Sequence, residues 1–203
     1  MLPLESMHAV YDLASRNSVP VHIDGARVFN AAAALRTESR NIAQHGDSIC
    51  FCVSKGLSAP VGSLLCGTDV FVERARAFRR MVGGNMRQAG PLAAAGIVAL
   101  ETMVDRLAQD HATAKRLAQG LNRIDAALVD PAGVETNIVK VEVPRTGPEA
   151  SAWAQALEKN AVRVSPCERY ALRFVTHRHI GEMEIGEALR AFEKVRRALG
   201  TAR

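Results

Sequence analysis

Two apolar segments of the sequence end next to charged side chains. Asp24 closes the segment VPVHID, and Lys55 directly follows the segment SICFCVS. Continuous apolar runs rich in β-branched residues are typical of strands that are buried on both faces of a parallel sheet. Ligands bind to such sheets at the carboxyl ends of the strands. The spacing therefore predicts that Asp24 and Lys55 face the same ligand.

The lysine has two interpretations. Lys55 is either a solvated loop charge, which is common at the start of a loop, or a nucleophilic amine that forms a Schiff base. Asp24 favours the second interpretation. A carboxylate that keeps a pyridine nitrogen protonated, together with a Schiff-base lysine, turns pyridoxal phosphate into an electron sink. Gly56 and Gly62 would let the backbone approach a flat ring or its phosphate.

The elements that must position these residues alternate along the chain. The segment ARVFNAAAALRTE is a strong helix former, so residues 20–54 are predicted to form a strand, a crossover helix and a parallel strand. The segment GSLLCG is expected to add an antiparallel or edge strand. Further expected elements are a helix ending at Asn17, helices over residues 69–82, 86–109, 111–125, 148–160 and 181–198, and strands in IVKVEV, VRVS and YALRFVTH.

This pattern predicts an α/β protein in two parts. Residues 1–125 form a large domain with parallel strands, and residues 126–203 form a small α+β domain. With 203 residues, of which 48% are hydrophobic, the chain is long enough to bury a core. The texture of the sequence changes near residues 126–136, where we place the boundary.

Composition and charge favour some classes of partner over others. The net charge is +5, but acidic residues are interspersed and aromatic residues make up only 4%, which disfavours a nucleic-acid surface. A small anionic ligand is a sufficient reason for the basic excess. The four cysteines lack metal-site spacing and are expected to be free, buried thiols in a reducing cytosol. No targeting segment or membrane-spanning run is visible, so we predict a cytoplasmic protein without membrane partners.

Four segments in register resemble the threonine aldolases: HIDGARVFNAA, SKGLSAPVGSLLCG, GGNMRQAGPLAAAG and TNIV. These enzymes belong to the aromatic amino-acid β-eliminating lyase and threonine aldolase group, within the fold type I pyridoxal-phosphate enzymes. The resemblance covers nearly the whole chain. It implies a lyase that uses pyridoxal 5'-phosphate to cleave threonine, or a related β-hydroxy-α-amino acid, to glycine and an aldehyde.

The resemblance also implies roles for individual residues. Lys55 would bind the cofactor covalently, and Asp24 would pair with its pyridine nitrogen. Ala26 would lie against one face of the ring, while Arg27 would approach the side of the phenolic oxygen. Arg173, in the segment ALRFVTH, resembles the arginine that binds the substrate carboxylate. No metal site is implied.

The resemblance to this family also has implications for the oligomeric state of the protein. The family builds its sites at a subunit interface, so a homo-oligomer, a dimer or a tetramer, is implied. Arg80 or Arg87 would then contact a neighbouring subunit's phosphate, although structural ion pairs are an equal alternative. Asn85 stands where the family usually has a third glycine in the turn before Arg87.

The chain is shorter than the family's enzymes, and we expect it to correspond to their carboxyl-terminal half to two-thirds. The large domain is then incomplete, without the phosphate-binding turn and the histidine that stacks on the ring. His22 is expected to pack beneath the site, and His177 and His179 to cap the small domain. Low activity of the chain alone is expected. Two alternatives remain: a pyridoxal-phosphate lyase that eliminates a β-substituent, and a truncated, non-catalytic oligomerisation module.

Overall fold

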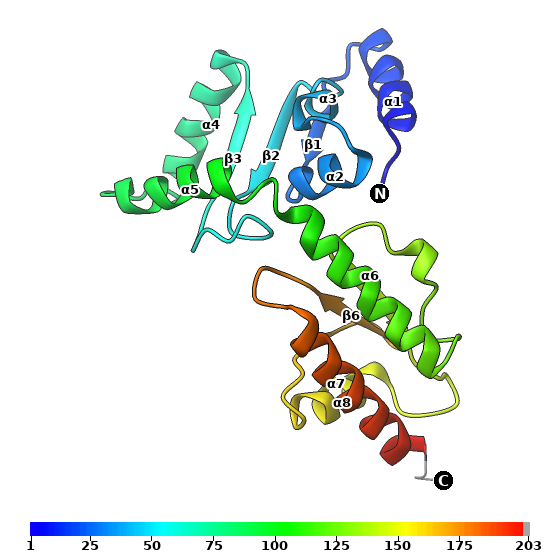
Figure 1. Cartoon of the computed structure of the whole chain (residues 1–203). Coiled ribbons are helices and arrows are strands. Elements are labelled where there is room, and N and C mark those ends of the chain that lie inside the picture. The colour runs from blue at the N-terminus through cyan, green and yellow to red at the C-terminus, as the bar shows by residue number, and fades with distance from the viewer. Residues whose placement is uncertain (201–203) are drawn as a thin grey trace. The chain divides into compact units, whose positions relative to one another are not determined.

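The computed structural model describes residues 1–200 and divides them into two compact units (Figure 1). The first unit spans Met1–Leu107, and the second begins at Ala108. The boundary therefore lies earlier than the expected one after residue 125. The reason is that helix α6 (Leu107–Ile124) buries one apolar face, including Leu117 and Leu121, in the core of the second unit.

The first unit contains a three-stranded sheet in the order β1-β2-β3. Strands β1 (His22–Asp24) and β2 (Ser48–Cys52) are parallel, and Asp24 lies opposite Cys50. Strand β3 (Ser63–Gly67) pairs antiparallel with β2 and forms an edge of the sheet. These pairings confirm the predicted parallel unit and the predicted antiparallel edge strand.

The crossover between β1 and β2 contains two helices, α2 (Val28–Leu35) and α3 (Ser39–Ala43), where one was predicted. Helix α2 ends because Arg36 adopts a left-handed conformation with φ of 53°. Two small apolar clusters form the core of this unit. The first joins α2, α3 and β2 through residues such as Val28 and Ile49, and the second surrounds the turn that follows β2.

Three further helices belong to the first unit: α1 (Leu4–Arg16), α4 (Asp69–Met81) and α5 (Gly90–Thr102). Helix α5 is shorter than the predicted span of residues 86–109. It begins late because residues 86–89 form a loop, and Pro91 then occupies the first turn, where a missing N–H is tolerated.

The second unit has an antiparallel sheet in the order β4-β6-β5, formed by β4 (Ile138–Glu142), β5 (Ser165–Glu168) and β6 (Ala171–Val175). Besides α6, it contains a 3-10 turn (Pro131–Gly133) and helices α7 (Ala150–Glu158) and α8 (Glu182–Gly200). Strand β5 begins at Ser165, where the predicted strand VRVS ends.

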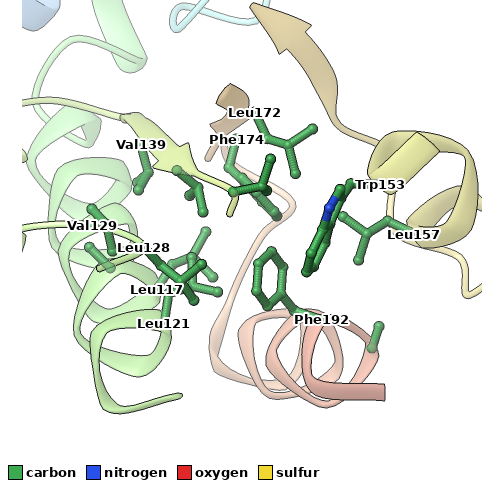
Figure 2. Packing of buried hydrophobic residues seen from close by; sticks show 14 of the residues in the cluster. Leu117, Leu121, Leu128, Val129, Val139, Trp153, Leu157, Leu172, Phe174 and Phe192 are labelled. Carbon is green, nitrogen blue, oxygen red and sulfur yellow. The ribbon is translucent and has the colours of Figure 1, made fainter. Parts of the chain in front are cut away.

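Alternation along the strands of this sheet decides which side chains are buried. Val139 and Phe174 enter the core, whereas Lys140 and Arg173 lie on the opposite, exposed face. Figure 2 shows the core, in which Trp153 stacks on Phe192 with ring centroids 5.3 Å apart. The second unit therefore has a continuous apolar core of its own.

The first unit leaves much apolar surface in contact with solvent. On the edge strand β3, Leu64 and Leu65 are each 40% exposed. On helix α4, Val70 is 73% exposed, Phe78 57% and Met81 78%. An exposed, apolar edge strand is a site at which other chains can add.

We expect the chain to self-associate through this surface. A double substitution, Leu64→Lys with Val70→Lys, should lower the sedimentation coefficient towards that of the monomer, because charge on an edge strand opposes strand addition. Glu73→Lys, on the same helix, serves as the control for added positive charge. A wild-type chain that sediments as a monomer at all concentrations would contradict this prediction.

Candidate cofactor and substrate site

Asp24 and Lys55 lie at the carboxyl ends of neighbouring parallel strands. Asp24 is the last residue of β1, and Lys55 follows the end of β2 after Val53 and Ser54. Since β1 and β2 are paired in parallel, both residues lie at the same edge of the sheet.

A tight turn positions Asp24. The backbone N–H of Gly25 donates a 2.8 Å hydrogen bond to the carbonyl oxygen of Cys50 on β2. A Cβ atom on Gly25 would lie only 2.8 Å from Cδ1 of Ile49, so the close approach requires glycine. The Asp24 carboxylate is exposed and accepts a 3.3 Å hydrogen bond from the Ala26 N–H through Oδ1. Within residues 1–200 it has no ion-pair partner.

Ala26 and Arg27 continue the same turn. Arg27 is the N-cap residue of helix α2, and its carbonyl oxygen accepts a hydrogen bond from the Ala31 N–H at 3.1 Å. Both residues are half-buried. The turn therefore brings Asp24, Ala26 and Arg27 together at the end of β1.

Lys55 lies in a second ordered turn. Its carbonyl oxygen accepts a hydrogen bond from Ser58 N–H at 2.9 Å, and the carbonyl oxygen of Val53 accepts one from Ala59 N–H at 3.0 Å. Val53, Leu57 and Ala59 are buried in the apolar cluster beneath the turn. The Lys55 side chain is exposed and has no polar partner in the described part of the chain. A fixed backbone thus presents a free amine.

Gly56 packs closely against two neighbours. A Cβ atom on Gly56 would lie 2.8 Å from Oδ1 of Asn30 and 2.9 Å from Cδ2 of Leu107. Asn30 belongs to helix α2 and is 3% exposed. The turn that carries Lys55 therefore packs against helix α2, which follows the turn of Asp24.

Arg173 belongs to the second unit. It lies on β6, opposite Lys140 of β4 and Ser165 of β5, and its side chain is exposed. Among the residues that the structure describes, its guanidinium has no hydrogen-bond or ion-pair partner. A free guanidinium fork matches a carboxylate in geometry and charge.

An ionic network beside Arg173 was not predicted from the sequence. The Lys140 ammonium lies 2.7 Å from Oε1 of Glu168 and 3.0 Å from Oε1 of Glu142. Hydrogen bonds to Glu168 and then Glu142 raise the pKa of Lys140 above its ordinary value. The alternation of apolar and charged residues in IVKVEV could have predicted that Lys140 and Glu142 lie on one face of a strand. Only the pairing of β4, β6 and β5 shows that Glu168 and Arg173 lie on the same face of the sheet.

Arg80 and Arg87 flank the turn between α4 and α5. Arg80 lies in the last turn of α4, Arg87 lies in the following loop, and both are exposed. Neither forms an ion pair within the described chain. Gly83 adopts a positive φ of 74°, whereas Asn85 does not, so Asn85 adds no left-handed strain to this turn.

His22, His177 and His179 each contact another side chain. Nδ1 of His22 lies 2.8 Å from the hydroxyl of Ser48, and His22 is exposed on β1. His177 and His179 follow β6 and touch edge to face, with centroids 5.8 Å apart. Within residues 1–200, no group of three or more His, Cys, Asp or Glu residues is arranged to hold a metal ion. In the same range, no helix has the length and apolar character needed to span a membrane.

The fold is that of the fold type I pyridoxal-phosphate enzymes. A solved structure from Exiguobacterium sp. 255-15, assigned to the aromatic amino acid beta-eliminating lyase/threonine aldolase group, matches with a TM-score of 0.80 and 20% sequence identity, over 96% of this chain and 58% of that protein. The structure of SPT with its pyridoxal-phosphate internal aldimine matches with a TM-score of 0.71 and 19% identity, over 98% of this chain and 52% of that protein.

Comparison of the sequence with known proteins identifies the family within this fold. The family model of the beta-eliminating lyases matches residues 1–144, and the chain belongs to this family. Over 96% of its length it is 42% identical to the probable low-specificity L-threonine aldolase 2 of Arabidopsis thaliana, of which it covers 55%. It is 37% identical to the low specificity L-threonine aldolase of Escherichia coli K12, over 92% of this chain and 54% of that protein. The chain thus spans about half the length of these relatives.

Gly56→Ala should destabilise the first unit and displace Lys55. The added methyl group would meet Asn30 and Leu107 at distances that force one of them to move, which typically costs about 1–3 kcal/mol. Thermal unfolding should show a lower melting temperature. Gly90→Ala is the matched control, because its Cβ would meet nothing within 4 Å. Equal melting temperatures for the two variants would refute this account of the turn.

Proposed function

We propose that this chain supplies the covalent lysine, the ring-nitrogen partner and the substrate-carboxylate residue of a pyridoxal-phosphate lyase. The reaction is the cleavage of threonine, or a related β-hydroxy-α-amino acid, to glycine and an aldehyde. The observation that carries the proposal is a pair of charged groups at neighbouring strand ends, Lys55 and Asp24, neither of which has an ion-pair partner within residues 1–200. The names of the threonine aldolases to which the chain is similar support the choice of substrate.

The residues of the first unit fit pyridoxal 5'-phosphate. The free amine of Lys55 can condense with the cofactor's carbonyl group, and the Asp24 carboxylate can accept a hydrogen bond from a protonated pyridine nitrogen. The small side chain of Ala26 leaves room for a ring face, and Arg27 supplies a cation for the phenolic oxygen. When bound, the cofactor withdraws electrons from the α-carbon of the substrate.

Each residue then has a defined task. Asp24 keeps a proton on the ring nitrogen, because a carboxylate at hydrogen-bonding distance stabilises the protonated form. The turn around Gly25 holds this carboxylate at the sheet edge. Arg173 binds the substrate carboxylate through its planar fork, which orients the α-carbon for bond cleavage. The hydrogen-bonded turn of Lys55 presents its amine from a fixed backbone.

We also propose that the protein works as a homo-oligomer, a dimer or a tetramer, in the cytoplasm. Exposed apolar side chains on β3 and α4 support association with another copy or with a complementary chain. Arg80 and Arg87 are exposed cations without an ion-pair partner in the described chain, which suits contact with a phosphate held by a neighbouring subunit. The four cysteines are free thiols, which agrees with a reducing compartment, but the expectation that they are buried is wrong, because two are half-buried and two are exposed.

Elimination of a β-substituent is a second candidate reaction, favoured by the family model that matches residues 1–144. It would use the same lysine and carboxylate, because both reactions need electron withdrawal from the α-carbon. Product assays separate the two reactions. Threonine cleavage releases glycine, whereas elimination from serine or cysteine releases pyruvate and ammonia.

Pyridoxal phosphate added to the chain at high concentration should become attached to Lys55. The amine is exposed, without a polar partner in residues 1–200, and lies at the same edge of the sheet as the Asp24 carboxylate, which is suited to the ring nitrogen. Borohydride reduction followed by peptide mapping measures the attachment, and Lys55→Ala is the control. Label on other lysines but not on Lys55 would remove this residue from its proposed role.

Arg173→Lys should weaken the binding of amino acids without weakening that of the cofactor. A lysine ammonium cannot reproduce the two parallel hydrogen bonds of a guanidinium, and a charge-assisted hydrogen bond is typically worth about 1.5–3 kcal/mol. Titration of the cofactor-loaded chain with threonine, followed by absorbance, gives the affinity. Arg163→Lys, on an exposed arginine of the same unit, is the control. Unchanged threonine affinity in Arg173→Lys would exclude the carboxylate role.

A further inference from the structure

Three charged residues share a face of the second sheet with Arg173. Lys140 of β4 lies directly opposite Arg173 of β6. Two positions further along β4, Glu142 lies opposite Ala171 of β6. Glu168 also lies opposite Ala171, from the other neighbouring strand. An irregularity between Pro166 and Glu168 shifts the register there and sets this pairing.

This arrangement places two carboxylates within reach of Arg173. Diagonal neighbours on one face of a sheet are about 7–8 Å apart, a separation that long side chains can bridge. Yet Arg173 has no ion pair among the described residues, whereas Lys140 contacts both Glu168, at 2.7 Å, and Glu142, at 3.0 Å. The ammonium therefore occupies both carboxylates that would otherwise compete for the guanidinium.

We propose that Lys140 is a positioning residue that keeps Arg173 free for a substrate carboxylate by holding Glu142 and Glu168. This inference rests on the proposed role of Arg173. The compact ammonium suits this task, because its three donors can serve two carboxylates at once. Hydrogen bonds to Glu168 and then Glu142 raise the pKa of Lys140, so it is charged at neutral pH, where a substrate carboxylate is ionised.

The test uses the whole chain without cofactor and acetate as the probe. Titration at low ionic strength is followed by the NMR signal of the Arg173 Nε–H group, which is assigned by its loss in Arg173→Lys. Lys140→Met should shift this signal before acetate is added, because the freed carboxylates pair with Arg173. Acetate affinity should fall about two- to fivefold, the scale of exposed ion pairs.

Two further variants separate positioning from direct binding. Lys140→Arg keeps a cation between the carboxylates and should retain wild-type affinity. The triple variant Lys140→Met, Glu142→Gln, Glu168→Gln removes the competitors and should regain it. A triple variant as weak as Lys140→Met would show that Lys140 itself binds the anion, and would overturn the proposal.

The remaining outcomes distinguish this inference from the proposed function. If acetate shifts the Arg173 signal equally in wild type and Lys140→Met, the positioning role is wrong while the carboxylate role of Arg173 stands. If acetate does not shift the signal in the wild-type chain, both are wrong. Melting temperatures of the variants should stay close to that of the wild type, since the three substituted side chains are 45–61% exposed.

Discussion

The parallel pairing of β1 with β2 is the constraint on which the candidate site depends. It brings the ends of two strands that are separated by a long crossover to one edge of a sheet. The 2.8 Å hydrogen bond from Gly25 to the Cys50 carbonyl oxygen then ties the turn of Asp24 to β2 itself. Since Lys55 follows the same strand, the carboxylate and the amine share a common frame. A side chain at position 25 would clash with Ile49 and the Cys50 carbonyl oxygen, and would move the turn of Asp24 away from β2.

The two charged groups are held by their backbones and not by each other. Within residues 1–200, neither Asp24 nor Lys55 has an ion-pair partner, although both are exposed at the same sheet edge. Buried apolar residues anchor the two turns instead: Val53 and Leu57 for the turn of Lys55, and Val28 for that of Asp24. Charged groups that remain unpaired but fixed are pre-organised for a ligand, because binding requires no internal ion pair to be broken.

In the second unit, Arg173 is also a charged group on an ordered backbone, but a neighbouring ion-pair network is involved. Its core, built around residues such as Trp153 and Phe192, fixes the strands and hence which side chains reach the exposed face. On that face, ion pairing between Lys140 and two glutamates leaves the guanidinium free. Within residues 1–200, both units therefore present charged side chains without an ion-pair partner on an ordered backbone.

The sequence by itself determined the α/β class, the parallel pair of strands with an edge strand, and the placement of Asp24 and Lys55 at strand ends. These features depend on local patterns: continuous apolar runs, a strong crossover helix and charges directly after the runs. Tertiary structure alone decided that the crossover has two helices, that α6 belongs to the second unit, and that Lys140, Glu142 and Glu168 share one face of the sheet with Arg173. The packing of α6 and the strand register depend on contacts between residues distant in sequence, which no local pattern encodes.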